Sequence, residues 1–166
     1  NLYYWGGANY VLKKLKFDFQ DHPDWIIICN NDIIFNKTDL LVKILAKNPN
    51  IHQVLAPKIF SSISKKNLNP YMVKPLNTLK KLYYSIFYFN SVTAYLIYKF
   101  RHLLKKIFSI FKFSNENDRK IYAPHGSFII FSKYFFQKGG YLDNNLTMYG
   151  EELTTAEITR RLKLPI

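Results

Sequence analysis

The sequence predicts an α/β fold in which a mostly parallel sheet is flanked by helices and interrupted by a basic, aromatic, helical insertion. Strand and helix patterns alternate in the first third of the chain and return after residue 120, which predicts the sheet. A long basic segment lies between them and predicts the insertion. With 166 residues, 48% of them hydrophobic, the chain can form a sizeable core and is not a disordered polypeptide.

The first third of the chain predicts a strand, a helix and a second strand. Trp25–Cys29 is a continuous apolar run, typical of a strand covered on both faces. Thr38 can cap a helix, and Gln53–Ala56 is the next strand candidate before Pro57. The helix is indicated by apolar residues at helical spacing, namely Leu40, Leu41, Ile44 and Leu45. A strand–helix–strand unit favours a parallel sheet.

Residues 61–120 differ from the rest of the chain in charge. The 76 residues from Leu40 to Asn115 contain no Asp or Glu but 13 of the 24 Lys and Arg residues, while the other basic residues balance the 11 acids. The net charge of +13 therefore belongs to one segment. Its partner should be an anionic surface, either nucleic acid or lipid headgroups.

This basic segment contains two blocks that predict its structure. Leu82–Tyr98 has 17 residues without a charge, and Phe100–Lys112 alternates apolar and basic residues at roughly helical spacing. A spanning helix needs about 20 mostly apolar residues, so a span is possible but marginal, and we expect a helical segment that rests on an anionic membrane surface. The alternative is that the block packs against the rest of the protein.

The last part of the chain returns to strand and helix patterns. Ser127–Phe131 is a strand candidate, Gly139–Gly140 a turn, and Glu151–Lys163 an amphipathic helix. The single cysteine, Cys29, excludes an intramolecular disulfide and a zinc site built from several cysteines.

Polar residues follow the first predicted strand. Asn30, Asn31 and Asp32 come directly after Trp25–Cys29. Ligands of a parallel sheet bind beyond the carboxyl ends of its strands, and an Asp there can hold a divalent cation that also contacts phosphate oxygens. The alternative is a polar turn with no ligand.

Three other groups could contribute to a site. Glu151 and Glu152 open the last predicted helix, where they either act as a general base or only complement the helix dipole. Trp5–Asn9 predicts a glycine-rich loop that could approach a ligand closely, although glycine pairs are common in simple turns. A histidine, His125, precedes the Ser127–Phe131 strand, and a lone histidine is more often structural than catalytic.

Taken in order, these segments resemble the family-two glycosyltransferases, inverting enzymes of the GT-A fold that use nucleotide-diphosphate sugars. The resemblance covers about half the residues and is carried by Trp5–Asn9, Trp25–Phe35, Val54–Lys58 and Ile121–Arg161. It implies a GT-A-like sheet with a donor-binding part in residues 1–60, the insertion in 61–120 and an acceptor-side part in 121–166. It also implies that the chain is an internal fragment of an enzyme nearer twice its length.

The resemblance assigns roles to particular residues. Asp32 would hold a Mg²⁺ or Mn²⁺ ion on the donor diphosphate, and Glu152 would be the general base, with Glu151 as the alternative. Ile158 occupies the place of the family's usual arginine. The implied substrate-binding residues are Gly7, Asn9, Asn30, Asn31, His125, Gly126 and Ser127.

The resemblance predicts a glycosyltransferase that moves a sugar, with inversion, from a nucleotide-diphosphate sugar to a glycan or lipid-linked acceptor. Such an enzyme would serve surface polysaccharide synthesis in the cytoplasm, peripheral to the inner face of the cell membrane. A non-catalytic nucleic-acid-binding protein is the alternative, because aromatics and lysines can stack bases and neutralise phosphates. The aromatics of this chain stand in an uncharged block, so we expect no nucleic-acid partner.

Overall fold

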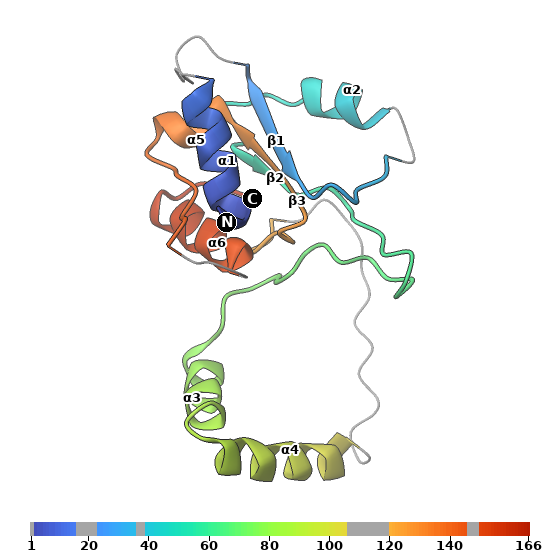
Figure 1. Ribbon diagram of the computed structural model, residues 1–166, viewed down its shortest axis with the longest axis vertical. Helices are drawn as coiled ribbons and strands as arrows, with labels where there is room; N and C mark the ends of the chain where they lie inside the picture. Colours follow the sequence, from blue (N-terminus) through green and yellow to red (C-terminus); the bar gives the residue numbers. More distant parts are fainter. Residues whose placement is uncertain (1, 16–22, 36–38, 106–119, 146–149) are drawn as a thin grey trace. The chain divides into compact units, whose positions relative to one another are not determined.

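The computed structural model describes residues 2–15, 23–35, 39–105, 120–145 and 150–166, with side chains omitted for 101–105 (Figure 1). The chain forms two compact units: the sheet unit, residues 1–74 and 120–166, and the helical unit, residues 75–119. The helical unit thus begins at Pro75, later than the predicted start of the insertion at residue 61. The described elements are α1 (Tyr3–Lys14), β1 (Trp25–Cys29), α2 (Asp39–Leu45), β2 (Val54–Leu55), α3 (Thr78–Phe87), α4 (Ser91–Lys105), β3 (Phe128–Ser132), α5 (Lys133–Gln137) and α6 (Glu151–Arg161).

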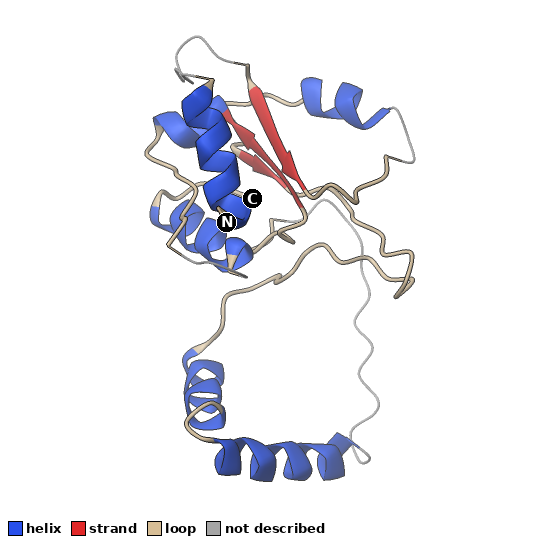
Figure 2. Ribbon diagram, in the orientation of Figure 1, coloured by secondary structure: helices blue, strands red, loops and turns tan. Residues whose placement is uncertain are grey.

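The described strands form one small antiparallel sheet in the order β1-β3-β2 (Figure 2). β3 pairs with β1 from Trp25 opposite Ser132 to Cys29 opposite Phe128, and β2 pairs with the other edge of β3. The prediction of a mostly parallel, GT-A-like sheet is therefore wrong. β1 and β2 do run in the same direction, as a strand–helix–strand unit requires, but β3 lies between them and is antiparallel to both.

β3, and not β1, is the strand covered on both faces. All five residues of β3 are buried, whereas β1 is an edge strand in which Ile27 is 36% exposed and Cys29 is also exposed. The continuous apolar run in β1 predicted a strand correctly but overestimated its burial.

The side chains of β3 alternate between two apolar clusters. Ile129 and Phe131 pack in one cluster with residues of α1, α5 and α6, and Phe128 and Ile130 pack in the other with Ile44 of α2. Figure 1 shows α1, α5 and α6 on one side of the sheet and α2 on the other. The sheet unit is thus a layered core built around one strand.

Trp5–Asn9 lies inside helix α1, so the prediction of a glycine-rich loop is wrong. Trp5 is 3% exposed in the main cluster, and Ala8 and Leu12, at helical spacing from it, pack against the same cluster. Two glycines inside a helix cost about 2 kcal/mol in propensity. The buried apolar face of the helix supplies the packing that offsets this cost.

Two asparagine caps determine the helices of the helical unit. The Asn77 side chain accepts the Lys80 N–H at 2.9 Å at the start of α3. Asn90 Oδ1 accepts the Thr93 N–H at 2.8 Å, and Thr93 Oγ1 accepts the Asn90 N–H at 3.3 Å, a reciprocal pair that begins α4. The charge-free block Leu82–Tyr98 therefore forms parts of two helices rather than one.

Among the described residues, no helix has both the length and the apolar character needed to cross a membrane.

Two glycine substitutions test this fold. Gly7→Ala should stabilise the chain by about 0.5–1 kcal/mol, because Gly7 is inside α1 and no atom lies within 4 Å of the position its Cβ would take.

Gly140→Ala should cost more than about 2 kcal/mol, because its Cβ would lie 2.6 Å from the Phe135 carbonyl oxygen and from the Phe135 ring. Urea denaturation of the two variants measures both effects. Destabilisation by Gly7→Ala would contradict the helical assignment of Trp5–Asn9.

Candidate functional site

Helix α6 begins with the two glutamates of the candidate site. Gly150, at the N-cap, has φ +118°, a left-handed conformation that glycine adopts without steric strain. Glu151 and Glu152 form the first turn, where carboxylates complement the helix dipole. The predicted start of this helix at Glu151 is confirmed, and it ends at Arg161, two residues before the predicted end.

The Glu152 carboxylate is bound by the turn that precedes β3. Glu152 Oε1 accepts the Gly126 N–H at 3.1 Å across 26 residues of sequence. A Cβ on residue 126 would lie 2.9 Å from that same oxygen, so glycine is the residue that permits this approach. No hydrogen bond joins the second oxygen, Oε2, to any residue that the structure describes, which leaves it able to accept a proton.

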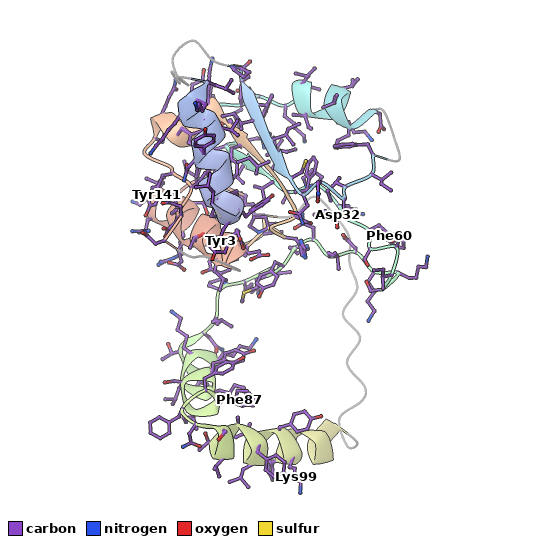
Figure 3. All side chains as sticks on the ribbon, in the orientation of Figure 1. Tyr3, Asp32, Phe60, Phe87, Lys99 and Tyr141 are labelled. Atoms are coloured by element: carbon purple, nitrogen blue, oxygen red, sulfur yellow. The ribbon has the colours of Figure 1, made fainter. Side chains whose placement is uncertain are left out.

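The same turn is joined to the end of β1. The Asn30 N–H donates to the Ser127 carbonyl oxygen at 2.9 Å, which extends the β1–β3 pairing by one hydrogen bond. Asn31 and Asp32 follow at once and are exposed, and Figure 3 shows Asp32 close to the end of β1. The turn therefore joins the strand end that carries Asp32 to the helix start that carries Glu152.

His125 and Ser127 form a local hydrogen-bonded pair. His125 Nδ1 accepts the Ser127 N–H at 3.3 Å and lies 2.9 Å from Ser127 Oγ. When Nδ1 accepts this N–H, the neutral ring carries its proton on Nε2. The ring is thus oriented by the chain and presents a donor at its far nitrogen.

Asn69 supports this turn and had no signal in the sequence. Its side chain is 5% exposed, its Oδ1 accepts the His125 N–H at 3.0 Å, and its Nδ2 donates to the Pro57 carbonyl oxygen at 2.7 Å. A buried amide that satisfies two backbone groups fixes the position of both segments. Asn69 therefore positions His125 from a loop 56 residues away in sequence.

Tyr4 is the second residue that the sequence did not indicate. Its hydroxyl oxygen is buried in α1 without a hydrogen-bond partner among the described residues. Burial raises the pKa of the Tyr4 phenol, and the nearby Cys29, Glu151 and Glu152 raise it further. These contributions place Tyr4 in the same electrostatic neighbourhood as the two glutamates and the end of β1, as a protonated phenol with an unused donor.

The structure does not group Gly7 and Asn9 with these residues. Gly7 approaches no other segment closely. Asn9 Nδ2 donates to the Leu142 carbonyl oxygen at 2.9 Å, so its amide fastens α1 to the loop after α5. Both residues have a structural explanation within the helix and its packing.

Ile158 and Arg160, later in α6, both have partners within the structure. Ile158, where the resemblance expects an arginine, is buried in the core. Arg160 donates to Glu157 Oε2 from Nη2 at 2.7 Å and from Nε at 3.1 Å. Glu157 also accepts the Tyr122 hydroxyl, and burial together with this hydrogen bond raises the pKa of Tyr122 to about 12. Tyr149 lies outside the described residues.

The polar residues at the end of β1 can bind a divalent cation only if a bound substrate supplies further ligand atoms. Asp32 offers one exposed carboxylate, and Asn30 and Asn31 offer amide oxygens beside it in sequence. Within the described ranges, no three His, Cys, Asp or Glu side chains are grouped as a metal cage. Mg²⁺ commonly binds through one or two carboxylates plus substrate phosphates, and this donor set fits that mode.

Comparison with models of protein families, with curated proteins and with solved structures gave no match to this chain.

The contact between Gly126 and Glu152 can be tested by a double-mutant cycle. Gly126→Ala should destabilise the chain by about 1–2 kcal/mol, because the new methyl group displaces the Glu152 carboxylate from its backbone donor. In a Glu152→Ala background the same substitution should cost about 1 kcal/mol less, since nothing at that position is displaced. Chemical denaturation of the four chains measures the coupling. An equal cost in both backgrounds would contradict the contact.

Proposed function

We propose that this chain carries the reaction centre of a glycosyltransferase that moves a sugar, with inversion, from a nucleotide-diphosphate sugar to an acceptor hydroxyl. One observation carries the proposal: the Gly126 turn binds the Glu152 carboxylate and pairs with Asn30, two residues before Asp32. A proton acceptor and a carboxylate suited to a cation on a diphosphate thus belong to one connected set of segments. Transfer of a sugar from a diphosphate to a hydroxyl can use both groups, one to accept the proton and one to hold the cation.

Glu152 is the proposed general base. Its Oε1 is held by a backbone N–H, which fixes the carboxylate orientation, and its Oε2 accepts the proton of the acceptor hydroxyl. The acceptor oxygen forms a bond to the anomeric carbon as the bond from that carbon to the diphosphate oxygen breaks. The nucleoside diphosphate leaves with the electron pair, from the face opposite the attack.

Asp32, with Asn30 and Asn31 beside it, is proposed to bind the donor diphosphate through Mg²⁺ or Mn²⁺. When bound, the cation offsets the negative charge that develops on the leaving group. His125 is proposed to donate from Nε2 to the donor, in an orientation set by Ser127 and Asn69.

The proposed acceptor is a glycan or a lipid-linked glycan, and the proposed process is surface polysaccharide synthesis at the inner face of the cell membrane. The net charge of +13 favours an enzyme that works beside anionic lipid.

The base is tested by isosteric substitution of each glutamate. Glu152→Gln should lower turnover of the full-length protein by roughly 10²–10⁴-fold, the scale of losing a general base, with little change in donor binding. Glu151→Gln is the matched control, because it removes the same charge from the same helical turn. Turnover is measured as sugar release from UDP-sugars, and donor binding is measured by calorimetry. Together the two measurements distinguish loss of the base from loss of donor binding in each variant. Loss of activity in Glu151→Gln alone would move the base to Glu151, and no loss in either would contradict the proposed reaction.

The cation site is tested at the two ends of β1. Asp32→Asn should abolish the dependence of donor binding on Mn²⁺ while the stability of the chain stays unchanged, because Asp32 is exposed. Asp24→Asn is the control: Asp24 precedes β1 at its other end and pairs with Lys133 at 3.0 Å. A Mn²⁺ titration of nucleotide binding should respond only to Asp32→Asn. An unaltered Mn²⁺ response in that variant would refute the role of Asp32.

A further inference from the structure

Helix α3 carries an apolar stripe that its own unit leaves partly exposed. Its hydrophobic residues follow the spacing i, i+3, i+4, i+7 and i+8 of a helical face: Leu79, Leu82, Tyr83, Ile86 and Phe87. Leu79 is 75% exposed and Leu82 58% exposed, and no residue of the helix is buried. An amphipathic helix of this kind normally covers its apolar stripe with a partner surface.

The exposed apolar surface continues through the connection and into α4. Phe89, in the connection, is 80% exposed, and the exposed residues of α4 include Val92, Leu96 and Phe100. Thr93 Oγ1 donates to the Ile86 carbonyl oxygen at 3.1 Å, so the two helices are joined at this corner. In the described part of the helical unit no hydrophobic side chain reaches core burial. Helices of 10 and 15 residues are marginal in water without such packing.

The charged side chains that the structure describes in the helical unit are all positive. Lys80 and Lys81 are exposed in the first turn of α3, and Lys99 is exposed in α4, with its Nζ 5.0 Å from the centre of the Tyr95 ring. No acidic residue occurs between Leu40 and Asn115, and the sequence continues with Arg101, Lys105, Lys106 and Lys112. A surface that combines apolar residues, tyrosines and unbalanced lysines is complementary to the headgroup region of an anionic bilayer.

We propose that the helical unit docks on an anionic lipid bilayer, with α3 and α4 lying in the interface. The apolar stripe and Phe89 enter the acyl boundary, the tyrosines lie at headgroup level, and Lys80, Lys81 and Lys99 supply positive charge near the lipid phosphates. Each described helix is shorter than the roughly 20 residues that span a bilayer. The inference goes beyond the proposed reaction and does not depend on it, because it concerns a separate unit.

Charge reversal tests the docking. In flotation with phosphatidylcholine vesicles containing phosphatidylglycerol, Lys80→Glu/Lys81→Glu should lower the partition coefficient about tenfold or more. Glutamates there complement the helix dipole, and one stands three residues after the Asn77 cap, so α3 keeps its helix. The matched control is Lys65→Glu/Lys66→Glu, the same change on an exposed loop of the sheet unit, which should leave binding nearly unchanged.

A second pair of variants tests the apolar contact. Phe89→Ser should also reduce flotation, whereas Ile63→Ser, at a residue that is 94% exposed in the sheet unit, should not. Binding should weaken from about 0.05 M to about 0.5 M salt and be weak on pure phosphatidylcholine. Absence of flotation, equal binding to neutral vesicles, or equal loss in test and control variants would overturn the proposal. A salt-dependent gel shift with RNA but no flotation would assign the surface to nucleic acid instead.

Discussion

The pairing of β3 on both of its edges is the constraint on which the sheet unit depends. Because β3 is antiparallel to β1, Phe128 lies opposite Cys29, and the turn before β3 is held beside the end of β1. Four of the five buried residues of β3 point alternately into two clusters, which pack with α1, α5 and α6 on one face and with α2 on the other. Once α6 packs through Ile158, its first turn reaches Gly126. The candidate site is therefore a consequence of strand pairing and helix packing together.

The two units differ in which of their groups have partners within the structure. In the sheet unit, several polar groups near the site have specific partners: Asn69 bonds to His125 and Pro57, and Gly126 bonds to Glu152. The helical unit caps its helix starts with Asn77 and Asn90, but leaves most of its described apolar side chains exposed. The first arrangement fixes a few groups for chemistry. The helical unit leaves an apolar, positively charged surface, and contact with a partner that is both apolar and anionic would lower its free energy.

Part of the candidate site could be predicted from the sequence. Glu151 and Glu152 were recognised because paired acids at a helix start follow a local rule, and Asn30 to Asp32 because they end an apolar run. Tyr4 and Asn69 could not be recognised, since a tyrosine in a helix and an asparagine before a proline have no local signature of a distant partner. Gly7 and Asn9 predicted a ligand-binding loop, because a glycine pair is typical of a turn. The packing of Trp5, which the sequence does not show, explains why the segment is a helix.

The sequence by itself determined the local elements: β1 with its exact ends at Trp25 and Cys29, β2 and β3 within a residue or two, and the start of α6 at Glu151. Periodicity and capping are properties of neighbouring residues, so a linear reading captures them. Only the tertiary structure decided that β3 enters between β1 and β2, that α1 is a helix despite its glycines, and that Glu152 reaches Gly126. These outcomes depend on contacts between residues that lie tens of positions apart in the sequence. Hydrophobic burial selects among such contacts, and because it is non-directional, a local sequence pattern does not show which apolar surfaces will pack together.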